Sequence, residues 1–284
     1  MPIPSTQNTY HNSTDNDLDR LLNEERSYNT TELARQVNQN IPLLNREQFQ
    51  IYEEVMQAVN DKYGHFFIDG FAGTGKTFLY NTLLATIRLH GDIAIAVASS
   101  GIAALLLSGG RTAHSRFKIP LKIDEFSTCN ISRNSQLACL INAAKLFIWD
   151  EAPMMHKPFG GKVFVFGGDF RQILPVIPHS RRADIVLASL TQSSLWSHIK
   201  VMKLSTNMRL QQTSDSVENL KQKEFAEFLL KIGDGTYTIN PGTENMITLP
   251  SNIVIIKGTL RNLIDFVYPD LVNNCGNADY MKMQ

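Results

Sequence analysis

The sequence predicts an α/β fold in which helices cover both faces of a parallel β-sheet. Short, almost wholly apolar runs, typical of strands that are buried on both faces, occur at residues 65–68, 93–98, 145–149 and 163–166. Helical periodicity occupies the stretches 77–89 and 102–107. Because strands alternate with helices in this way mainly when the strands run parallel, a parallel sheet is expected.

The composition is that of an ordinary globular protein, with 43% apolar and 19% charged residues in 284. Since 27 basic residues balance 27 acidic ones, any site for nucleic acid must be local. The cysteines, Cys129, Cys139 and Cys275, lie outside metal-ligand spacing, which argues for reduced thiols and against structural zinc. We expect no membrane contact and a nuclear or cytosolic location, because no apolar run spans a bilayer and no presequence is visible.

Three stretches of different character divide the chain. Residues 1–40 are rich in Asn, Thr, Ser and Asp, so we expect a polar tail that adds little to the core. Residues 41–205 carry the regular strands and helices and form the expected main domain. Residues 206–284 are mostly helical in pattern, with Phe225, Phe228, Leu229 and Ile232 on one face, and predict a second, smaller domain.

A glycine-rich motif follows the first strand and opens a helix. Residues 70–77 read GFAGTGKT and match the phosphate-binding pattern G-x-x-x-x-G-K-[ST]. Backbone N–H groups of such a loop surround phosphate oxygens, and the helix N-terminus adds positive potential. We expect Lys76 to reach the β- and γ-phosphates of a nucleoside triphosphate and Thr77 to hold Mg²⁺, with a chance glycine-rich turn as the alternative. The candidate ATP-binding residues here are Gly70, Phe71, Ala72, Gly73, Thr74, Gly75, Lys76 and Thr77.

Two carboxylates close the apolar run at 145–149. An acid at the C-terminal end of a parallel strand can reach Mg²⁺ beside the phosphate-binding loop, so Asp150 joins Thr77 as a candidate metal residue. Glu151 is a candidate base for the attacking water. Because a kinase needs no such second base, the pair favours hydrolysis of ATP over phosphate transfer, and a solvated acidic strand end is the alternative.

A neutral amide follows the apolar run at 163–166. Residues 167–172 read GGDFRQ, and their glycines allow close approach of the backbone to a nucleotide. Gln172 can then contact the γ-phosphate and report its loss to a neighbouring element. Glycine–aspartate turns are common, so this motif alone is only a moderate signal.

A basic stretch without acidic residues extends over 101–123. Cations, small hydroxyl residues and an aromatic side chain suit a groove that tracks the phosphates and stacks the bases of a nucleic-acid strand. A solvated loop is the alternative. The candidate nucleic-acid-binding residues, which the family resemblance described below assigns to DNA, are Ser99, Ser100, Gly101, Arg111, His114, Arg116, Phe117 and Lys118.

The order of these motifs resembles that of one known family. The matching segments are Gln48, GFAGTGKT, ASSGIAALLLSGGRTAHSRF, FIWDEAPM, GGDFRQILPV and LSTNMR. They are similar to the petite-integration-frequency family of superfamily-one DNA helicases, which includes the helicase part of Helitron transposon replicases. The resemblance covers residues 17–271 and implies a RecA-like P-loop ATPase domain followed by a second RecA-like domain. It also implies 5′-to-3′ unwinding of DNA driven by ATP and Mg²⁺, single-stranded and duplex DNA as partners, and roles in telomere maintenance, repair and recombination.

The resemblance assigns roles to three further positions. Gln48 looks like the family's adenine-reading glutamine, and Gln172 like the residue that links the γ-phosphate to DNA. Arg209 looks like the arginine that reaches across the cleft between the domains to stabilise transition-state charge. With Lys76, Asp150 and Glu151, Gln172 and Arg209 make up the expected catalytic set.

Two departures from the family pattern qualify these expectations. Eleven residues lie between Asp150 and Lys162, where the family has a helix of about twenty residues, so we expect one face of the sheet near Asp150 to lack its cover. The chain also ends before the later motifs of the second domain, which is therefore expected to be partial. An active helicase, a remnant that binds ATP or DNA without unwinding, and a P-loop kinase thus remain three hypotheses, the kinase being disfavoured.

Overall fold

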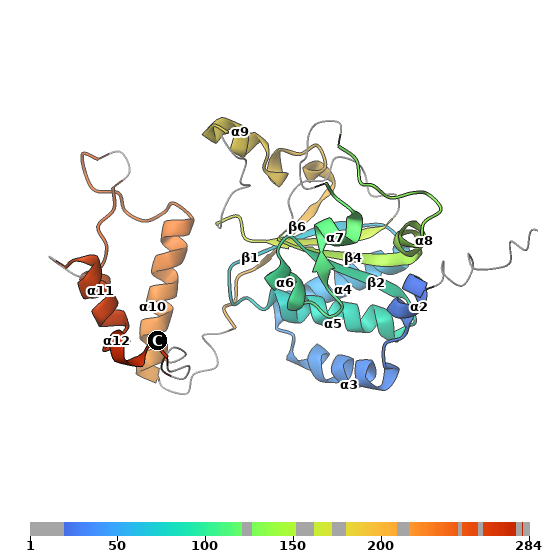
Figure 1. Ribbon diagram of the computed structural model, residues 1–284, viewed down its shortest axis with the longest axis horizontal. Coiled ribbons are helices and arrows are strands. Elements are labelled where there is room, and N and C mark those ends of the chain that lie inside the picture. The colour runs from blue at the N-terminus through green and yellow to red at the C-terminus, as the bar shows by residue number, and fades with distance from the viewer. Residues whose placement is uncertain are drawn as a thin grey trace, which may run out of the picture. The chain divides into compact units, whose positions relative to one another are not determined.

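The computed structural model describes residues 20–120, 127–151, 162–171, 180–208, 216–243, 246–254, 258–276 and 280 (Figure 1). The chain divides into two compact units, residues 1–223 and 224–284. Their boundary falls within α10 (Ser216–Gly233), after the boundary at 205 that the sequence suggests. Gln172 and Arg209 lie outside the described residues.

A six-stranded sheet forms the centre of the first unit, and every pair of neighbouring strands is parallel. The strand order is β3-β2-β4-β5-β1-β6. The strands are β1 (His65–Gly70), β2 (Ile93–Ala98), β3 (Arg111–Thr112), β4 (Ala144–Asp150), β5 (Val163–Gly168) and β6 (Lys200–Leu204). The α/β prediction is therefore confirmed. Because parallel strands end at the same edge, the C-terminal ends of β1, β4 and β5 come together there.

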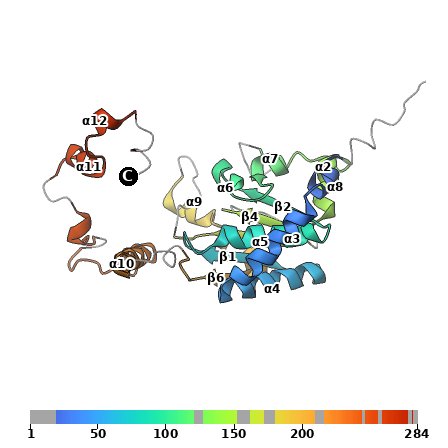
Figure 2. The ribbon, with the colours of Figure 1, turned by 90° about the horizontal axis from the view of Figure 1, so that it is seen from below.

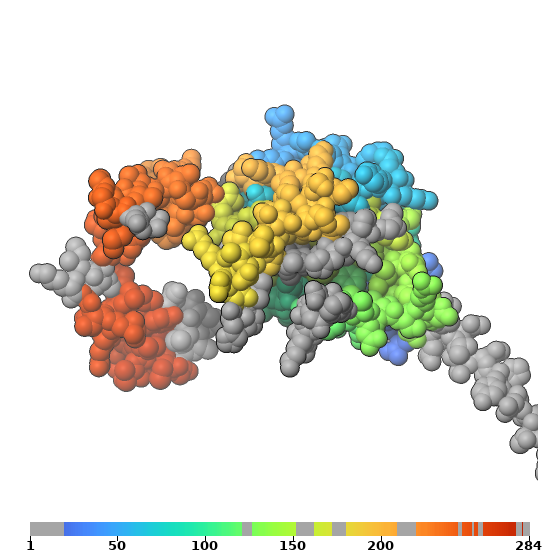
Figure 3. All heavy atoms as spheres, turned by 90° about the horizontal axis from the view of Figure 1, so that it is seen from above, coloured from blue at the N-terminus to red at the C-terminus, as the bar shows by residue number. Residues whose placement is uncertain are grey.

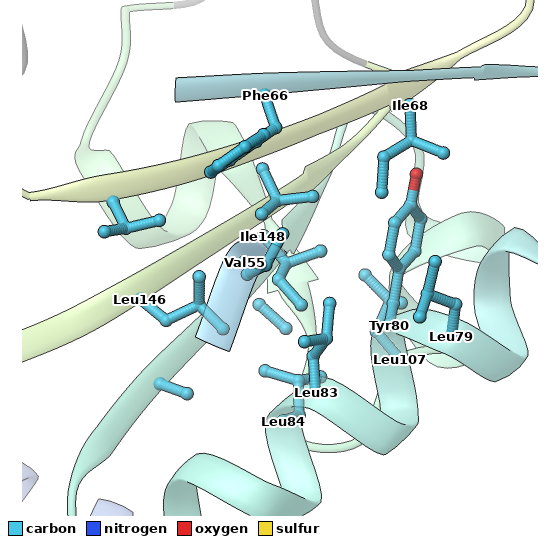
Figure 4. Packing of buried hydrophobic residues seen from close by; sticks show 14 of the residues in the cluster. Val55, Phe66, Ile68, Leu79, Tyr80, Leu83, Leu84, Leu107, Leu146 and Ile148 are labelled. Carbon is cyan, nitrogen blue, oxygen red and sulfur yellow. The ribbon is translucent and has the colours of Figure 1, made fainter. Parts of the chain in front are cut away.

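One face of the sheet is covered by α4 (Arg46–Asp61), α5 (Lys76–Leu89) and α6 (Gly101–Leu105). Helix α4 begins with a capping box, in which Asn45 and Gln48 each bond the other's backbone N–H, and ends at Lys62 in the left-handed conformation. Val55, Leu83 and Ile148 are fully buried where the helices meet the sheet (Figure 4). This face positions α5 directly after the phosphate-binding loop.

The opposite face of the sheet is covered by short elements. They are α2 (Arg20–Arg26), α7 (Ala113–Phe117), α8 (Gln136–Ala143), η2 (Leu190–Gln192) and η3 (Trp196–His198). The rings of Phe147 and Phe164 stack beneath them with centroids 4.6 Å apart, and Trp149 and Phe166 are 4% and 2% exposed. The expectation of an uncovered face near Asp150 is therefore wrong, although residues 152–161 lie outside the described part of the chain.

Residues 20–40 also differ from the expected polar tail. Helix α3 (Thr30–Asn40) begins at Asn29, whose side chain accepts hydrogen bonds from the backbone N–H groups of Thr31 and Glu32. Leu33 and Val37, four residues apart, are buried against Ala85 of α5, and Figure 1 shows α3 as an outer layer over α5. The partly buried Tyr28, Ile41 and Leu89 pack against this cluster, and the side chain of Asn40 donates to Oγ1 of Thr82 at 3.2 Å.

The remaining elements of the first unit are η1 (Ile41–Leu43) and α9 (Arg182–Leu187). The second unit holds the rest of α10, η4 (Ser251–Ile253), α11 (Leu260–Val267) and α12 (Leu271–Asn274) (Figure 2). A capping box between Thr259 and Asn262 begins α11. The helical pattern predicted after residue 206 is thus present in the described residues. Within them, no helix combines the length and apolar character needed to cross a membrane.

Candidate ATP site and DNA-binding segment

The phosphate-binding loop connects the end of β1 to the start of α5. Gly73 and Gly75 have φ angles of 91° and 80°, which residues other than glycine rarely adopt. A Cβ on Gly70 would stand 2.7 Å from Oγ1 of Thr74, and that hydroxyl donates to the carbonyl of Phe71 at 3.0 Å. The positive φ angles of Gly73 and Gly75 and the close packing at Gly70 therefore favour glycine at these three positions.

Lys76 lies at the first position of α5, with its side chain folded back along the loop. Its ammonium donates to the carbonyl oxygens of Gly70 and Phe71. Burial lowers the pKa of Lys76, and nearby carboxylates oppose that shift. An incoming phosphate would thus meet a partly desolvated cation that already points into the loop. The carboxylates that act on it are those of Asp150, Asp169, Asp69 and Glu151.

Gln48 is 1% exposed and reaches the same loop from α4. Its side-chain oxygen accepts from the backbone N–H of Asn45 at 3.0 Å. Its side-chain nitrogen donates to the carbonyls of Thr74 at 3.0 Å and Gly75 at 3.4 Å. The residue that the family resemblance assigns to adenine therefore braces the base of the loop in this structure.

Asp150 ends β4 beside β5, and it is 9% exposed. Its Oδ1 accepts from the backbone N–H of Glu151 at 3.1 Å. Burial raises the pKa of Asp150, and the positive charge of Lys76 opposes the shift. Strand β5 lies between β1 and β4, and its Gly167 is in register with Ile68 of β1 and with Asp150 of β4. Asp150 therefore lies at the same edge of the sheet as the phosphate-binding loop.

The donor set at this edge suits Mg²⁺. Among the described residues, the charged side chains that act on Lys76 are carboxylates, and Thr77, half-buried one position further on, offers a hydroxyl. Hard cations such as Mg²⁺ prefer oxygen ligands and usually take one or two carboxylates together with phosphate oxygens. Thr77 and Asp150 therefore fit the metal role that the sequence predicts.

Glu151 is exposed and adopts φ 55°, a left-handed conformation that is uncommon for a glutamate. The hydroxyl of Ser99 donates to its carbonyl oxygen. The hydroxyl of Ser100 donates to its Oε2 at 3.3 Å. The candidate base for hydrolysis is thus held by two residues of the candidate DNA-binding segment.

That segment runs from Ser99 through α6, β3 and α7. Ser100 caps α6, and Gly101 opens it. Arg111, His114 and Lys118 are exposed. The ring of Phe117 stacks on Trp149 of β4, with centroids 5.5 Å apart.

Arg116 departs from the expected DNA contact. Its side chain is 3% exposed, and its Nη2 donates to Oε1 of Glu25 at 2.6 Å. Arg88 lies near the same carboxylate, with 3.8 Å between its Nη2 and Oε2 of Glu25, and its guanidinium lies 4.2 Å from the ring centroid of Tyr28. Arg116 therefore ties α7 to α2 and is not available to a phosphate in this structure. Glu25 escaped the sequence analysis because nothing in a polar stretch marks one carboxylate for burial.

A second contact set that the sequence did not reveal joins α4 to the segment after β6. The carboxylate of Glu47 accepts from the backbone N–H groups of Ser205 at 2.8 Å and Thr206 at 3.3 Å. The backbone N–H of Met208 donates to the carbonyl of Gly73 at 2.9 Å. Figure 3 shows the gold surface around β6 beside the blue surface of α4. The chain thus leaves the sheet across the phosphate-binding loop.

Comparison with known proteins identifies the family. The model of the PIF1-like helicase family matches residues 43–157 and 156–242. The chain is 31% identical over 165 residues to the ATP-dependent DNA helicase Pif1 of Psychrobacter sp. (strain PRwf-1), a match that covers 51% of this chain and 25% of that protein. It is 27% identical over 211 residues to the ATP-dependent DNA helicase RRM3 of Saccharomyces cerevisiae, covering 66% of this chain and 29% of that protein. The matches thus span about a quarter to under a third of these relatives.

Solved structures agree with the fold. The crystal structure of Pif1 helicase from Candida albicans aligns with a TM-score of 0.53 at 24% identity, over 68% of this chain and 44% of that one. Pif1 from Bacteroides in complex with ADP-AlF3 and single-stranded DNA aligns with a TM-score of 0.51 at 24% identity, over 66% and 46% of the two chains. At this identity the likeness concerns the fold, which is that of a RecA-like domain. Since the family model matches well over half of the residues, this chain belongs to the PIF1-like helicase family.

Proposed function

We propose that this chain binds ATP and Mg²⁺, hydrolyses ATP, and forms the motor part of a helicase that moves 5′ to 3′ along DNA. The observation that carries the proposal is the meeting of Lys76 with Asp150 and Glu151 at one edge of the sheet. These are the parts that ATP hydrolysis needs in P-loop enzymes. Family membership supports the same reading.

Each of these side chains has a distinct task in the proposed reaction. Lys76 exchanges the loop carbonyls for the β- and γ-phosphates and places positive charge where the transition state gains negative charge. Thr77 and Asp150 would hold Mg²⁺, which when bound neutralises charge on the phosphate oxygens. Glu151 takes the proton of the attacking water, and it can do so only after its carboxylate turns from Ser100 toward the nucleotide.

Gln48, Gln172 and Arg209 complete the proposed ATP site. Gln48 turns from the loop toward adenine, Gln172 senses the γ-phosphate, and Arg209 stabilises the charge of the transition state. The segment after β6 leads from the phosphate-binding loop to the position just before Arg209, which supports a role for Arg209 near the nucleotide.

DNA is proposed to lie along the segment from Ser99 to Lys118. Arg111, His114 and Lys118 supply exposed cations or donors for phosphates, and Ser99 and Ser100 link the segment to Glu151. Because such contacts reach the backbone rather than base edges, binding is expected to tolerate any sequence and to weaken with salt. Both single-stranded and duplex DNA are proposed as partners. A nuclear location, the Helitron branch, and roles in telomere maintenance, repair and recombination belong to the same proposal.

The decisive experiment measures ATP hydrolysis by the purified chain with Mg²⁺, with and without a single-stranded oligonucleotide. Hydrolysis stimulated by DNA would support the helicase hypothesis. Lys76→Ala should weaken ATP binding by about 1.5–3 kcal/mol, and Glu151→Gln should bind ATP without hydrolysing it. Lys145→Ala is the matched control, because Lys145 is a surface cation paired with Asp92.

Unwinding is tested separately by strand displacement on a duplex with a 5′ single-stranded tail. Sustained displacement supports a helicase, whereas ATP or DNA binding without hydrolysis supports the second hypothesis, a binding protein. Equal affinity for ATP in the parent and in Lys76→Ala would refute the assignment of the phosphate-binding loop. Transfer of phosphate to a small acceptor would instead reveal a kinase.

A further inference from the structure

Tyr80 is a buried polar residue that the proposed function does not yet use. It lies on α5, one turn after Lys76, and it is 0% exposed. Figure 4 shows its hydroxyl extending from α5 toward the strand that carries Ile68. Among the described residues this hydroxyl has no hydrogen-bond partner. A phenylalanine would fill the same space without the cost of burying an unpaired hydroxyl.

The hydroxyl occupies the place that a side chain on Gly167 would take. A Cβ built on Gly167 would stand 1.8 Å from Oη of Tyr80 and 3.0 Å from Oδ1 of Asp150. Gly167 is the register partner of Asp150 in the neighbouring strand. The tyrosine hydroxyl and the Asp150 carboxylate therefore flank the same small space, which exists because residue 167 is a glycine.

The chemistry of the two groups is complementary. Burial, with the charge of Asp150, raises the pKa of Tyr80 well above its ordinary value, so the phenol keeps its proton and remains a donor. Asp150 accepts a bond from the backbone of Glu151 on Oδ1, and a carboxylate has room for several more donors. A carboxylate that must stay ionised in a buried place gains from each donor it receives.

We propose that Tyr80 is a positioning residue for Asp150, and that Gly167 is glycine to make room for it. When ATP and Mg²⁺ fill the site, the hydroxyl donates to the Asp150 carboxylate, directly or through one water, and fixes the orientation in which the carboxylate serves the metal. Outer partners of this kind commonly orient metal-binding carboxylates. The inference rests on the proposed function, since it concerns the same ATP site.

The test compares Tyr80→Phe with the parent by calorimetric titration of ATP, once with Mg²⁺ and once with a chelator. Without metal, both should bind ATP within about twofold of each other. With Mg²⁺, the gain in affinity should fall by about tenfold in Tyr80→Phe, the low end of what loss of such an outer partner costs. The melting temperature of metal-free Tyr80→Phe should equal or exceed that of the parent, because an unpaired buried hydroxyl is removed.

Tyr52→Phe is the matched control, because it also deletes a phenol hydroxyl from the first unit. That hydroxyl pairs with Oγ1 of Thr86 at 3.1 Å, away from Asp150. Its loss should lower the melting temperature and leave the gain from Mg²⁺ unchanged.

Two further variants test the match between residues 80 and 167. Gly167→Ala alone should lower the melting temperature, and adding Tyr80→Leu should recover part of that loss, since the atoms that clash are gone. A parent that fails to bind ATP would overturn the proposed function and this inference together. A parent that binds ATP with a gain from Mg²⁺ that Tyr80→Phe fully retains would overturn this inference alone.

Discussion

Replacing Glu25 by alanine tests how firmly the N-terminal helix is tied to the rest of the first unit. Glu25 is 8% exposed, and its carboxylate faces two buried guanidinium groups, with the shorter contact to Arg116 at 2.6 Å. Arg88 keeps other acceptors, the carbonyls of Ser108 at 2.9 Å and Ala94 at 3.0 Å. Among the described residues, the side chain of Arg116 donates a hydrogen bond to Glu25 and to no other acceptor. The substitution therefore leaves the buried guanidinium of Arg116 without a hydrogen-bond acceptor, whereas that of Arg88 keeps its two carbonyl acceptors.

Removing one partner of a buried ion pair costs about 3–5 kcal/mol. With about 2–4 °C for each kcal/mol in domains of 150–250 residues, the melting temperature should fall by roughly 6–20 °C. The same loss of stability should lower the urea concentration at the midpoint of unfolding. Tryptophan fluorescence reports that midpoint, because Trp149 stacks on Phe117, the residue directly after Arg116. The double variant Glu25→Ala with Arg116→Met should recover most of the loss, since no buried cation is left unpaired.

Glu32→Ala is the control, because Glu32 forms an exposed ion pair with Arg35 within α3, the helix that follows α2. It should leave the unfolding midpoint unchanged. If Glu25→Ala unfolds at the same urea concentration as Glu32→Ala, the ion pair contributes nothing and the reasoning is refuted.

Three other predictions concern the site itself. The pKa of Asp150 is raised in the folded chain above its ordinary value of 3.8, so between the unfolded and the folded pKa the native chain binds more protons than the unfolded one, and its stability falls as pH rises through that window. Metal-free Asp150→Asn should lack this fall and melt at a higher temperature than the parent at pH 7. A lower melting temperature would contradict this prediction. Ser100→Ala frees the carboxylate of Glu151 and should change the ratio of DNA-stimulated to basal hydrolysis at unchanged ATP affinity, while Ser115→Ala should not. Arg111→Ala with Lys118→Ala should flatten the log–log salt dependence of single-strand binding by about 0.7 per lost phosphate contact, and an unchanged slope would place DNA elsewhere.

The fold and the phosphate-binding loop were predictable because their signals are local. A complete glycine-rich motif between an apolar run and a helix fixes strand, loop and helix within a few residues, and the Asp150–Glu151 pair follows its own strand. Parallel pairing then brings these ends to one edge without further information.

The contacts that sequence reasoning missed are made between distant residues. Glu25 and Arg116 are 91 positions apart, so a cation in a basic stretch looked like a phosphate contact although it is buried against an acid. Glu47 and Ser205 are 158 positions apart. The cover of the second face was missed for a related reason, because it consists of several short elements that each contribute only a few apolar side chains.

The hydrogen bond from Met208 to Gly73 makes one backbone amide an internal reporter for the phosphate-binding loop. Exchange of that amide hydrogen with solvent requires the bond to open, so its rate measures how often the loop and the segment after β6 separate. A nucleotide that holds the loop in place should slow exchange at this position, whereas one that pulls the loop away should speed it. Occupancy of the ATP site is therefore readable at a residue that need not touch the nucleotide, without any label added to the chain.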